Sequence, residues 1–238
     1  MRFVRLPSSI RTLALGTLAA FAGVLPAHAQ TGAGDSGSFL VSVGGRQVGT
    51  EEFSIVQTGA GANSEIVATG HIQLQLASGS VELTPRLRTS GFQARPVSYE
   101  VSVGGVSPRR VVSTIANGRV SARTLTGAGE QMREYLASAD AVVLDDGVAH
   151  QYYFLARRLR NGTVSVIIPR ENRQVTATVS ARGEETLQIG AQRVSLYHLI
   201  VTPAGGDARH VWVDALGRVI KVEIPARDYS AVRSQIPA

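Results

Sequence analysis

Apolar and polar side chains alternate with a period of two along most of the chain beyond residue 38. In residues 65–76, isoleucine, alanine and leucine side chains fall on one face, while the glutamines and His71 fall on the other. This alternation is typical of a β-strand with one buried face and one solvated face. The pattern recurs in residues 39–43, 46–57, 81–88, 97–103, 110–115, 119–125, 164–168, 175–181, 186–189, 194–201, 209–214 and 218–224.

Short glycine-containing turns separate these segments. Gly44-Gly45 and Asn117-Gly118 are typical of two-residue hairpin turns, and Arg182-Gly183 predicts a further turn. Strands joined by such short turns pair antiparallel. Pro85 cannot donate a ladder hydrogen bond, so its strand is expected to lie at an edge or to bend. Pro225 is expected to end the last strand.

The period changes once, in the middle of the chain. Val148, Tyr152, Leu155 and Leu159 are spaced as one face of a helix, which predicts a helix over residues 146–160. Asp145 and Asp146 suit its start, and Asn161-Gly162 suits its end. A weaker helical turn is expected over residues 130–137.

These elements predict a mainly β protein of the α+β class. A sheet of about twelve strands must curl, close or split, and the apolar stripe of the central helix needs a surface that buries it. We therefore expect a large curled antiparallel sheet, an unclosed or half β-barrel, wrapped around one or two helices. The helix over residues 146–160 would fill the concave side. A β-sandwich is the competing architecture, which a single helix in mid-chain fits less well.

The first thirty residues resemble a secretory signal peptide rather than part of the fold. Its arginines are Arg2, Arg5 and Arg11, and an apolar stretch follows over residues 13–24. The A-x-A site that ends at Ala29 predicts cleavage before Gln30 and a periplasmic or secreted protein; an uncleaved anchor is the alternative. Residues 1–29 are then the signal peptide, 30–37 a flexible leader, and 38–238 a single domain.

Composition excludes several classes of protein. The 238 residues contain no cysteine, which rules out disulfides, thiolate metal sites, a cysteine nucleophile and a cysteine-linked lipid anchor. The formal net charge of +6 falls to +3 without the signal peptide, and the basic residues are interspersed with acidic ones. Nucleic-acid binding needs a basic stripe with interleaved aromatics; none is present, and no nucleic-acid partner is expected.

Three stretches carry a resemblance to a known group of proteins. They are GGRQVGTEEFSI (residues 44–55), YYFLARRL (residues 152–159) and HVWVDALGRVIKVEIP (residues 210–225). With the export signal, they resemble uncharacterised secreted bacterial half-barrel families similar in fold to LolA and LolB, the unclosed-barrel lipoprotein carriers. The resemblance implies a half-barrel and no assigned activity. LolB-type proteins are anchored through a cysteine, so the likeness to them is confined to the fold.

No motif indicates catalysis. Asp35-Ser36-Gly37 matches the aspartic-protease triplet, but that chemistry needs the aspartate on a rigid loop after an apolar strand, and here the triplet lies in the predicted flexible leader. Nucleophile-elbow and zinc-protease motifs are absent from the sequence. The histidines His71, His150, His198 and His210 lack metal-ligand spacing, which favours four unrelated residues. No catalytic residue, metal or cofactor is therefore expected, and the protein is predicted not to be an enzyme.

A ligand cavity is the remaining functional hypothesis. Tyr152, Tyr153, Leu155 and Trp212 are interpreted first as core and second as the lining of a cavity on the concave face. Such a cavity would bind a lipid or another apolar molecule, with arginine at its mouth for an anionic head group. The alternatives are a non-catalytic structural or assembly component of the envelope, which would have a protein partner, and a hydrolase with dispersed residues.

Overall fold

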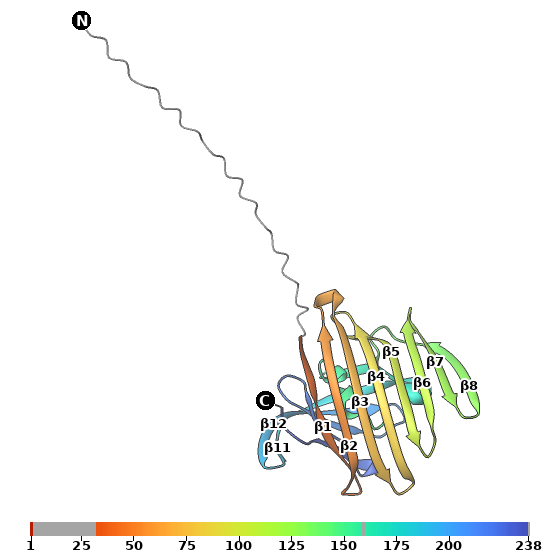
Figure 1. Ribbon diagram of the computed structural model, residues 1–238. Helices are drawn as coiled ribbons and strands as arrows, with labels where there is room; N and C mark the ends of the chain where they lie inside the picture. The colour runs from red at the N-terminus through yellow and green to blue at the C-terminus, as the bar shows by residue number, and fades with distance from the viewer. Residues whose placement is uncertain (2–31, 159, 238) are drawn as a thin grey trace.

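The computed structural model describes residue 1, residues 32–158 and residues 160–237 (Figure 1). Fifteen strands form one sheet. Their bounds are β1 Gly32–Val43, β2 Arg46–Thr58, β3 Glu65–Leu76, β4 Gly79–Ser90, β5 Arg95–Gly105, β6 Arg109–Ala116, β7 Arg119–Thr126, β8 Gly129–Leu136, β9 Val142–Val143, β10 Gly162–Ile168, β11 Arg173–Ile189, β12 Gln192–Pro203, β13 Arg209–Val213, β14 Val219–Ile224 and β15 Tyr229–Arg233. The helical elements are η1 Gly61–Asn63, η2 Ala149–Gln151, α1 Tyr152–Ala156, η3 Pro169–Glu171 and η4 Pro225–Arg227.

The sheet is a meander with its two halves joined at the ends of the described chain. Its order runs from β8 down to β1, then from β15 down to β9. Neighbouring strands pair antiparallel, except for the short parallel pair of β9 and β10. Within the described residues β8 and β9 stay unpaired with each other, so the curled sheet is unclosed. The predicted half-barrel class is confirmed. Figure 1 shows β1–β8 side by side in one wall, with the C-terminal strands behind it.

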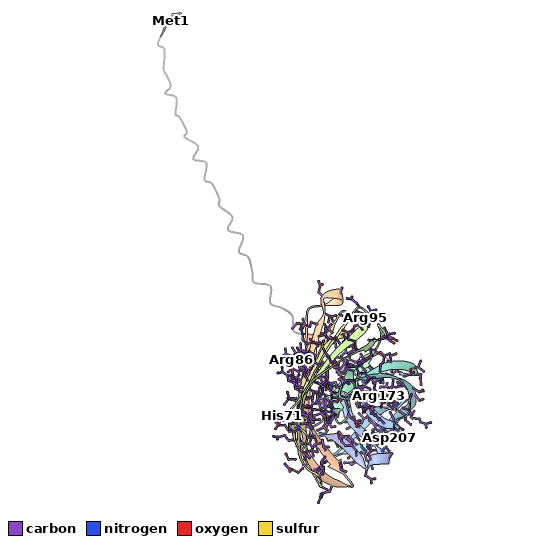
Figure 2. The ribbon with its side chains drawn as sticks, turned by 90° about the vertical axis from the view of Figure 1, so that its right-hand side faces the viewer. Met1, His71, Arg86, Arg95, Arg173 and Asp207 are labelled. Carbon is purple, nitrogen blue, oxygen red and sulfur yellow. The ribbon has the colours of Figure 1, made fainter. Side chains whose placement is uncertain are left out.

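The main core lies on the concave side of the sheet. Residues 137–156, a segment that we call the plug, run through this concavity and contribute Val142, Leu144, Tyr153 and Leu155 to the same cluster as the inward-facing strand residues. Outward-facing residues are mostly polar, and Figure 2 shows His71 and Arg86 on the outer surface of the β3–β4 wall. A smaller apolar cluster occupies the other face of β11–β14. Its buried members are Ile189, Leu196, Trp212 and Ile220.

The predicted central helix is much shorter than expected. Only Tyr152–Ala156 is α-helical, preceded by the turn η2, and Leu159 lies outside the described residues. Asp145 and Asp146 do not cap it, because their carboxylates pair with arginines from other elements. Residues 141–145 and 148–156 of the plug are all buried, so its apolar spacing reflects burial rather than a long amphipathic helix.

The expected helical turn over residues 130–137 is also wrong. Gly129–Leu136 is the edge strand β8, and nearly all its residues are exposed. An edge strand with two solvated faces has no alternation to reveal it. The turn expected at Arg182-Gly183 is instead an irregularity inside the long strand β11, whose register against β12 shifts between Ala181 and Gly183.

Three further expectations change at the ends and in the middle of the sheet. Strand β1 begins at Gly32 and pairs with β2 there, so most of the predicted flexible leader is strand. Pro225 starts η4, after which β15 adds another strand. Pro85 lies in an interior strand that pairs with both β3 and β5. The expected edge position is therefore wrong. The ladder between β3 and β4 is interrupted beside the proline. The predicted signal peptide and its cleavage site lie outside the described residues, apart from Met1.

Candidate functional site

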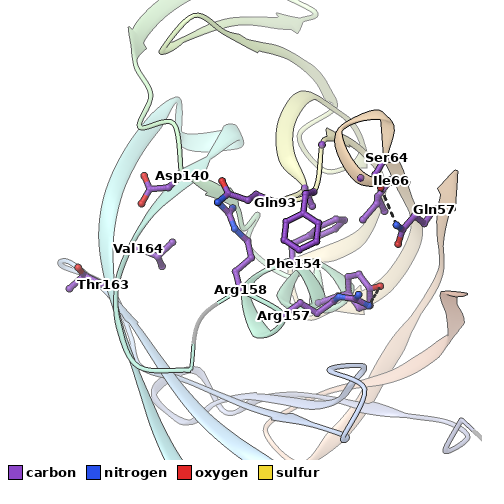
Figure 3. A pocket seen from close by; sticks show the side chains of 15 residues that line it. Gln57, Ser64, Ile66, Gln93, Asp140, Phe154, Arg157, Arg158, Thr163 and Val164 are labelled. Atoms are coloured by element: carbon purple, nitrogen blue, oxygen red, sulfur yellow. Dashed lines mark hydrogen bonds between the residues drawn. The ribbon is translucent and has the colours of Figure 1, made fainter. Parts of the chain in front are cut away.

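A cavity of about 560 Å³ opens at the end of the half-barrel where β2 joins β3 and β4 joins β5 (Figure 3). It lies beside the C-terminal end of α1. Such a volume is in the range of small-molecule sites. The lining residues are Gln57, Gly61, Ser64, Ile66, Gly91, Phe92, Gln93, Ala94, Asp140, Tyr153, Phe154, Arg157, Arg158, Thr163 and Val164. We call this the loop-end cavity.

Its inner wall is apolar. Phe154 is 3% exposed and packs edge to face on Tyr153, with ring centroids 5.5 Å apart. Ile66 and Val164 come from strands on opposite sides of the plug. Phe92 stands at the rim and is 89% exposed. The β4–β5 turn that carries it needs positive φ at Gly91 and Ala94, and that turn projects the ring away from the core.

The polar wall carries two consecutive arginines just after α1. Arg157 donates to the Tyr153 hydroxyl at 2.6 Å, and its guanidinium lies 5.0 Å from the centre of that ring. Arg158 donates to the Ala141 carbonyl at 3.1 Å. Burial lowers the pKa of the Arg158 guanidinium, while the charge of Asp140 acts in the opposite direction. Within the described chain, neither arginine has a carboxylate within 4.0 Å. Two cationic side chains therefore lie beside the apolar wall of this cavity, and Asp140 is the acidic residue in its lining.

The plug is fixed in the concavity by Glu51, which is fully buried. Its two oxygens accept hydrogen bonds from the backbone N–H groups of Ala149 and His150, at 2.8 and 2.9 Å. The Nδ1 atom of His150 lies 2.7 Å from Glu51 Oε1. The imidazole rests against Gly70, where an added Cβ would lie 2.8 Å from its ring. A side chain at position 70 would displace the histidine, so the glycine leaves the space that the imidazole of the plug occupies.

A second polar network holds the plug at Asp145 and Asp146, a few residues before the Glu51 contacts. Asp145 accepts from the Tyr99 hydroxyl at 2.7 Å and from Arg170 at 2.8 Å. Burial raises the pKa of the Asp145 carboxyl, and Arg170 opposes that effect. Asp146 pairs with Arg209 at 3.0 Å and also with Arg227. Strands and turns from both halves of the sheet are thus tied to two consecutive aspartates.

The four residues predicted to line a cavity lie in three different places. Tyr153 lines the loop-end cavity. Tyr152 is buried, and its hydroxyl accepts from Arg209 at 3.1 Å. Leu155 is fully buried in the main core. Trp212 lies on the other face of the sheet, where its indole donates to Glu185 at 2.9 Å. The structure does not bring the four together.

Two sequence interpretations of polar residues are changed by the fold. Asp35 of the protease-like triplet is buried and forms an ion pair with Arg233, rather than facing a second carboxylate. His198 and His210 are not unrelated, because neighbouring strands place His198 Nε2 2.9 Å from His210 Nδ1. Arg157, Arg158 and Phe92 were missed as candidates, and only the arginine run after the helix hinted at them.

The chain matches no known protein-family profile, and no curated protein matches it in sequence. Among solved structures, it is similar to a β-barrel-like protein of domain of unknown function DUF1849 from Brucella abortus. The TM-score is 0.53, the identity is 7%, and the match covers 84% of this chain and 94% of that one. At this identity the likeness shows the fold alone. No helix in the described residues is long and apolar enough to cross a membrane.

Proposed function

We propose that this protein is a non-catalytic binding module for an apolar molecule with an anionic head group. The carrying observation is the pairing of an apolar inner wall with Arg157 and Arg158, which have no carboxylate partner among the described residues. Apolar contacts with Phe154 and Ile66 would supply affinity. The guanidinium groups would take the head group through charge-assisted hydrogen bonds.

Phe92 supports the same proposal. An aromatic side chain that is 89% exposed at the rim of a cavity extends the apolar wall outward. An acyl chain leaving the cavity would cover this ring and remove it from water. A ligand longer than the cavity itself would reach this ring.

Export is part of the proposal and rests on the sequence. The arginines, apolar stretch and A-x-A site of residues 1–29 support cleavage before Gln30 and a periplasmic or secreted protein. A carrier resembling LolA or LolB in fold would act there. Sequencing the N-terminus of the protein from its native host tests this step. A product that retains Met1 would contradict it.

The binding test compares two head groups on the same acyl chain. Calorimetry with delipidated protein should show tighter binding of lysophosphatidylglycerol, which is anionic, than of zwitterionic lysophosphatidylcholine. The double variant Arg157→Gln/Arg158→Gln should lose this preference, by tenfold or more. The control Arg46→Gln/Arg86→Gln removes the same charge from exposed positions and should bind as the unmodified protein does. Equal binding by both double variants would refute the proposal.

An assembly role is the second candidate, and the edge strand β8 favours it. Its residues are nearly all exposed, including Met132 at 67% and Leu136 at 73%. An unpaired strand edge accepts a partner strand through backbone hydrogen bonds. The backbone N–H of Ala137 donates to Gly118 at the end of the β7–β8 ladder, so in this register the N–H of Met132 faces away from β7. Replacing Met132 with proline would block pairing with a partner strand, and capture of a partner that survives this change would argue against it.

A further inference from the structure

A second cavity, of about 450 Å³, lies at the opposite end of the half-barrel from the loop-end cavity. We call it the hairpin-end cavity, since the β3–β4 hairpin forms one wall. Its aliphatic lining residues are Val43, Leu74, Leu76, Val81, Leu83 and Ile224. Several of these side chains are only partly buried, although they face inward. The cavity thus presents an aliphatic surface that the plug does not cover.

The carboxylates around this cavity already have cationic partners. Asp145 is paired with Arg170, and Asp146 with Arg209 and Arg227. Glu171 lies 2.5 Å from Arg173, and Asp207 lies 2.6 Å from Arg227. These pairs account for every acidic residue that lines the cavity. They leave no carboxylate available to a further cation.

Arg109 is that further cation. It lines the hairpin-end cavity from the start of β6, and its Nε is buried with no hydrogen-bond partner. No ion pair joins it to a carboxylate in the described part of the chain. Tyr229, on another wall, has a buried hydroxyl that is likewise unpartnered. Buried donors without partners are rare, because a buried donor has lost its hydrogen bonds to water and gains none in return.

We propose that the hairpin-end cavity binds an aliphatic monocarboxylate, with the carboxylate on Arg109 and the tail along the β3–β4 wall. One unpaired guanidinium matches one negative charge, and Nε with a terminal nitrogen forms the fork that carboxylates accept. The site is separate from the loop-end cavity and has its own cation. It therefore stands or falls independently of the proposed function.

The test uses delipidated protein with laurate, dodecanol and inorganic phosphate as probes, measured by calorimetry. Laurate should bind at least tenfold more tightly than dodecanol, and phosphate should not bind. Arg109→Gln should lower laurate affinity at least tenfold without changing that of dodecanol. Arg110→Gln is the matched control, because the adjacent side chain faces outward and pairs with Glu100 at 2.6 Å.

Two outcomes of these measurements would contradict the proposal. Equal laurate binding by the Arg109 and Arg110 variants would overturn it, and phosphate binding as tight as that of laurate would replace it with a free-anion site. If Arg109→Gln does not fold, Leu76→Glu places a like charge on the cavity wall and should abolish laurate binding. The Arg157→Gln/Arg158→Gln variant should retain the Arg109-dependent binding, which separates this site from the loop-end cavity.

Discussion

Two histidines of this protein each contact a glutamate and an aromatic ring, one on the inner face of the sheet and one on the outer face. Inside the half-barrel, His150 Nδ1 lies 2.7 Å from Glu51, and the ring stacks on Phe53 with centroids 5.6 Å apart. On the other face of the sheet, His198 Nδ1 lies 2.7 Å from Glu185, and the ring stacks on Trp212 at 4.4 Å. The two sites contain the same types of contact, but the two glutamates accept hydrogen bonds from different groups.

The inner glutamate holds backbone, and the outer one holds side chains. The Glu51 and His150 side chains are fully buried, and Glu51 also accepts two backbone N–H groups of the plug. The Glu185 side chain is 40% exposed, and its second oxygen accepts only from the Trp212 indole. A buried carboxylate that satisfies backbone donors is costly to remove, whereas solvent replaces much of what an exposed one provides. The inner cluster of Glu51 and His150 should therefore contribute much more to the stability of the fold than the outer cluster of Glu185, His198 and Trp212.

The plug itself gives the largest expected effect. Proline at Ala156 removes a hydrogen bond in α1 and clashes with the preceding turn, so the protein should unfold globally or fail to accumulate. The milder Leu155→Ala should cost about 2–5 kcal/mol, the range for a buried leucine. Urea unfolding followed by circular dichroism measures both. A cooperative β-domain that persists in the proline variant would show that the plug is peripheral.

Glu51→Gln addresses the inner cluster directly. The variant keeps the shape but removes the charge and one of the two acceptor oxygens that serve three donors. We expect a loss of about 3–5 kcal/mol, the range for removing one partner of a buried pair. Glu52→Gln is the matched control, because the next side chain points outward and is exposed. Equal stability of the two variants would contradict the role given to Glu51.

Glu185→Gln makes the same change in the outer cluster. Here the expected loss is at most about 1 kcal/mol, because the carboxylate is partly solvated. The emission of Trp212, the only tryptophan in the sequence, should shift when its indole loses the charged acceptor. A destabilisation as large as that of Glu51→Gln would remove the contrast between the two sites.

The smallest effect is a pH dependence of the outer cluster. Burial and the neighbouring His198 lower the pKa of His210 below its usual 6.5. The folded state then binds fewer protons than the unfolded state, so this contribution is present above pH 6.5 and is lost as the pH falls below it. Unfolding at pH 7.5 and 5.5 should show a smaller difference for His210→Gln than for the control His71→Gln, whose side chain is 42% exposed on the outer surface. The same difference in both variants would rule His210 out.

The sequence predicted most of the sheet, because strands with one wet face keep a strict alternation. It failed where that physical basis is missing. Strand β8 is solvated on both faces, and residues 148–156 of the plug are buried on all sides, so neither segment carries a clean period. The irregularity in β11 depends on its pairing with β12, and the strand β15 that follows Pro225 depends on its pairing with β1, which is distant in the chain.

The candidate site was less predictable than the fold. Tyr153 was among the expected cavity residues and does line the loop-end cavity. Arg109, Arg157 and Arg158 look like ordinary surface arginines in the sequence. They stand out because the fold pairs the neighbouring carboxylates with other arginines. Ion pairs between distant strands cannot be predicted from local residue spacing. Gly70 is similar, since only the position of His150 explains it.

The placement of β15 between β1 and β14 has a consequence for how the chain reaches this structure. Asp35 and Arg233 form a buried ion pair although they are 198 positions apart, and β1 pairs with β15 over five residues. Contacts of such separation give a high contact order and slow folding. During synthesis from the N-terminus, β1–β8 would form a sheet whose β1 edge stays open until the final strand emerges. The nascent chain therefore has an unpaired strand edge, open to pairing with other chains, for most of its synthesis. A holdase that shields β1 would raise the yield of folded protein.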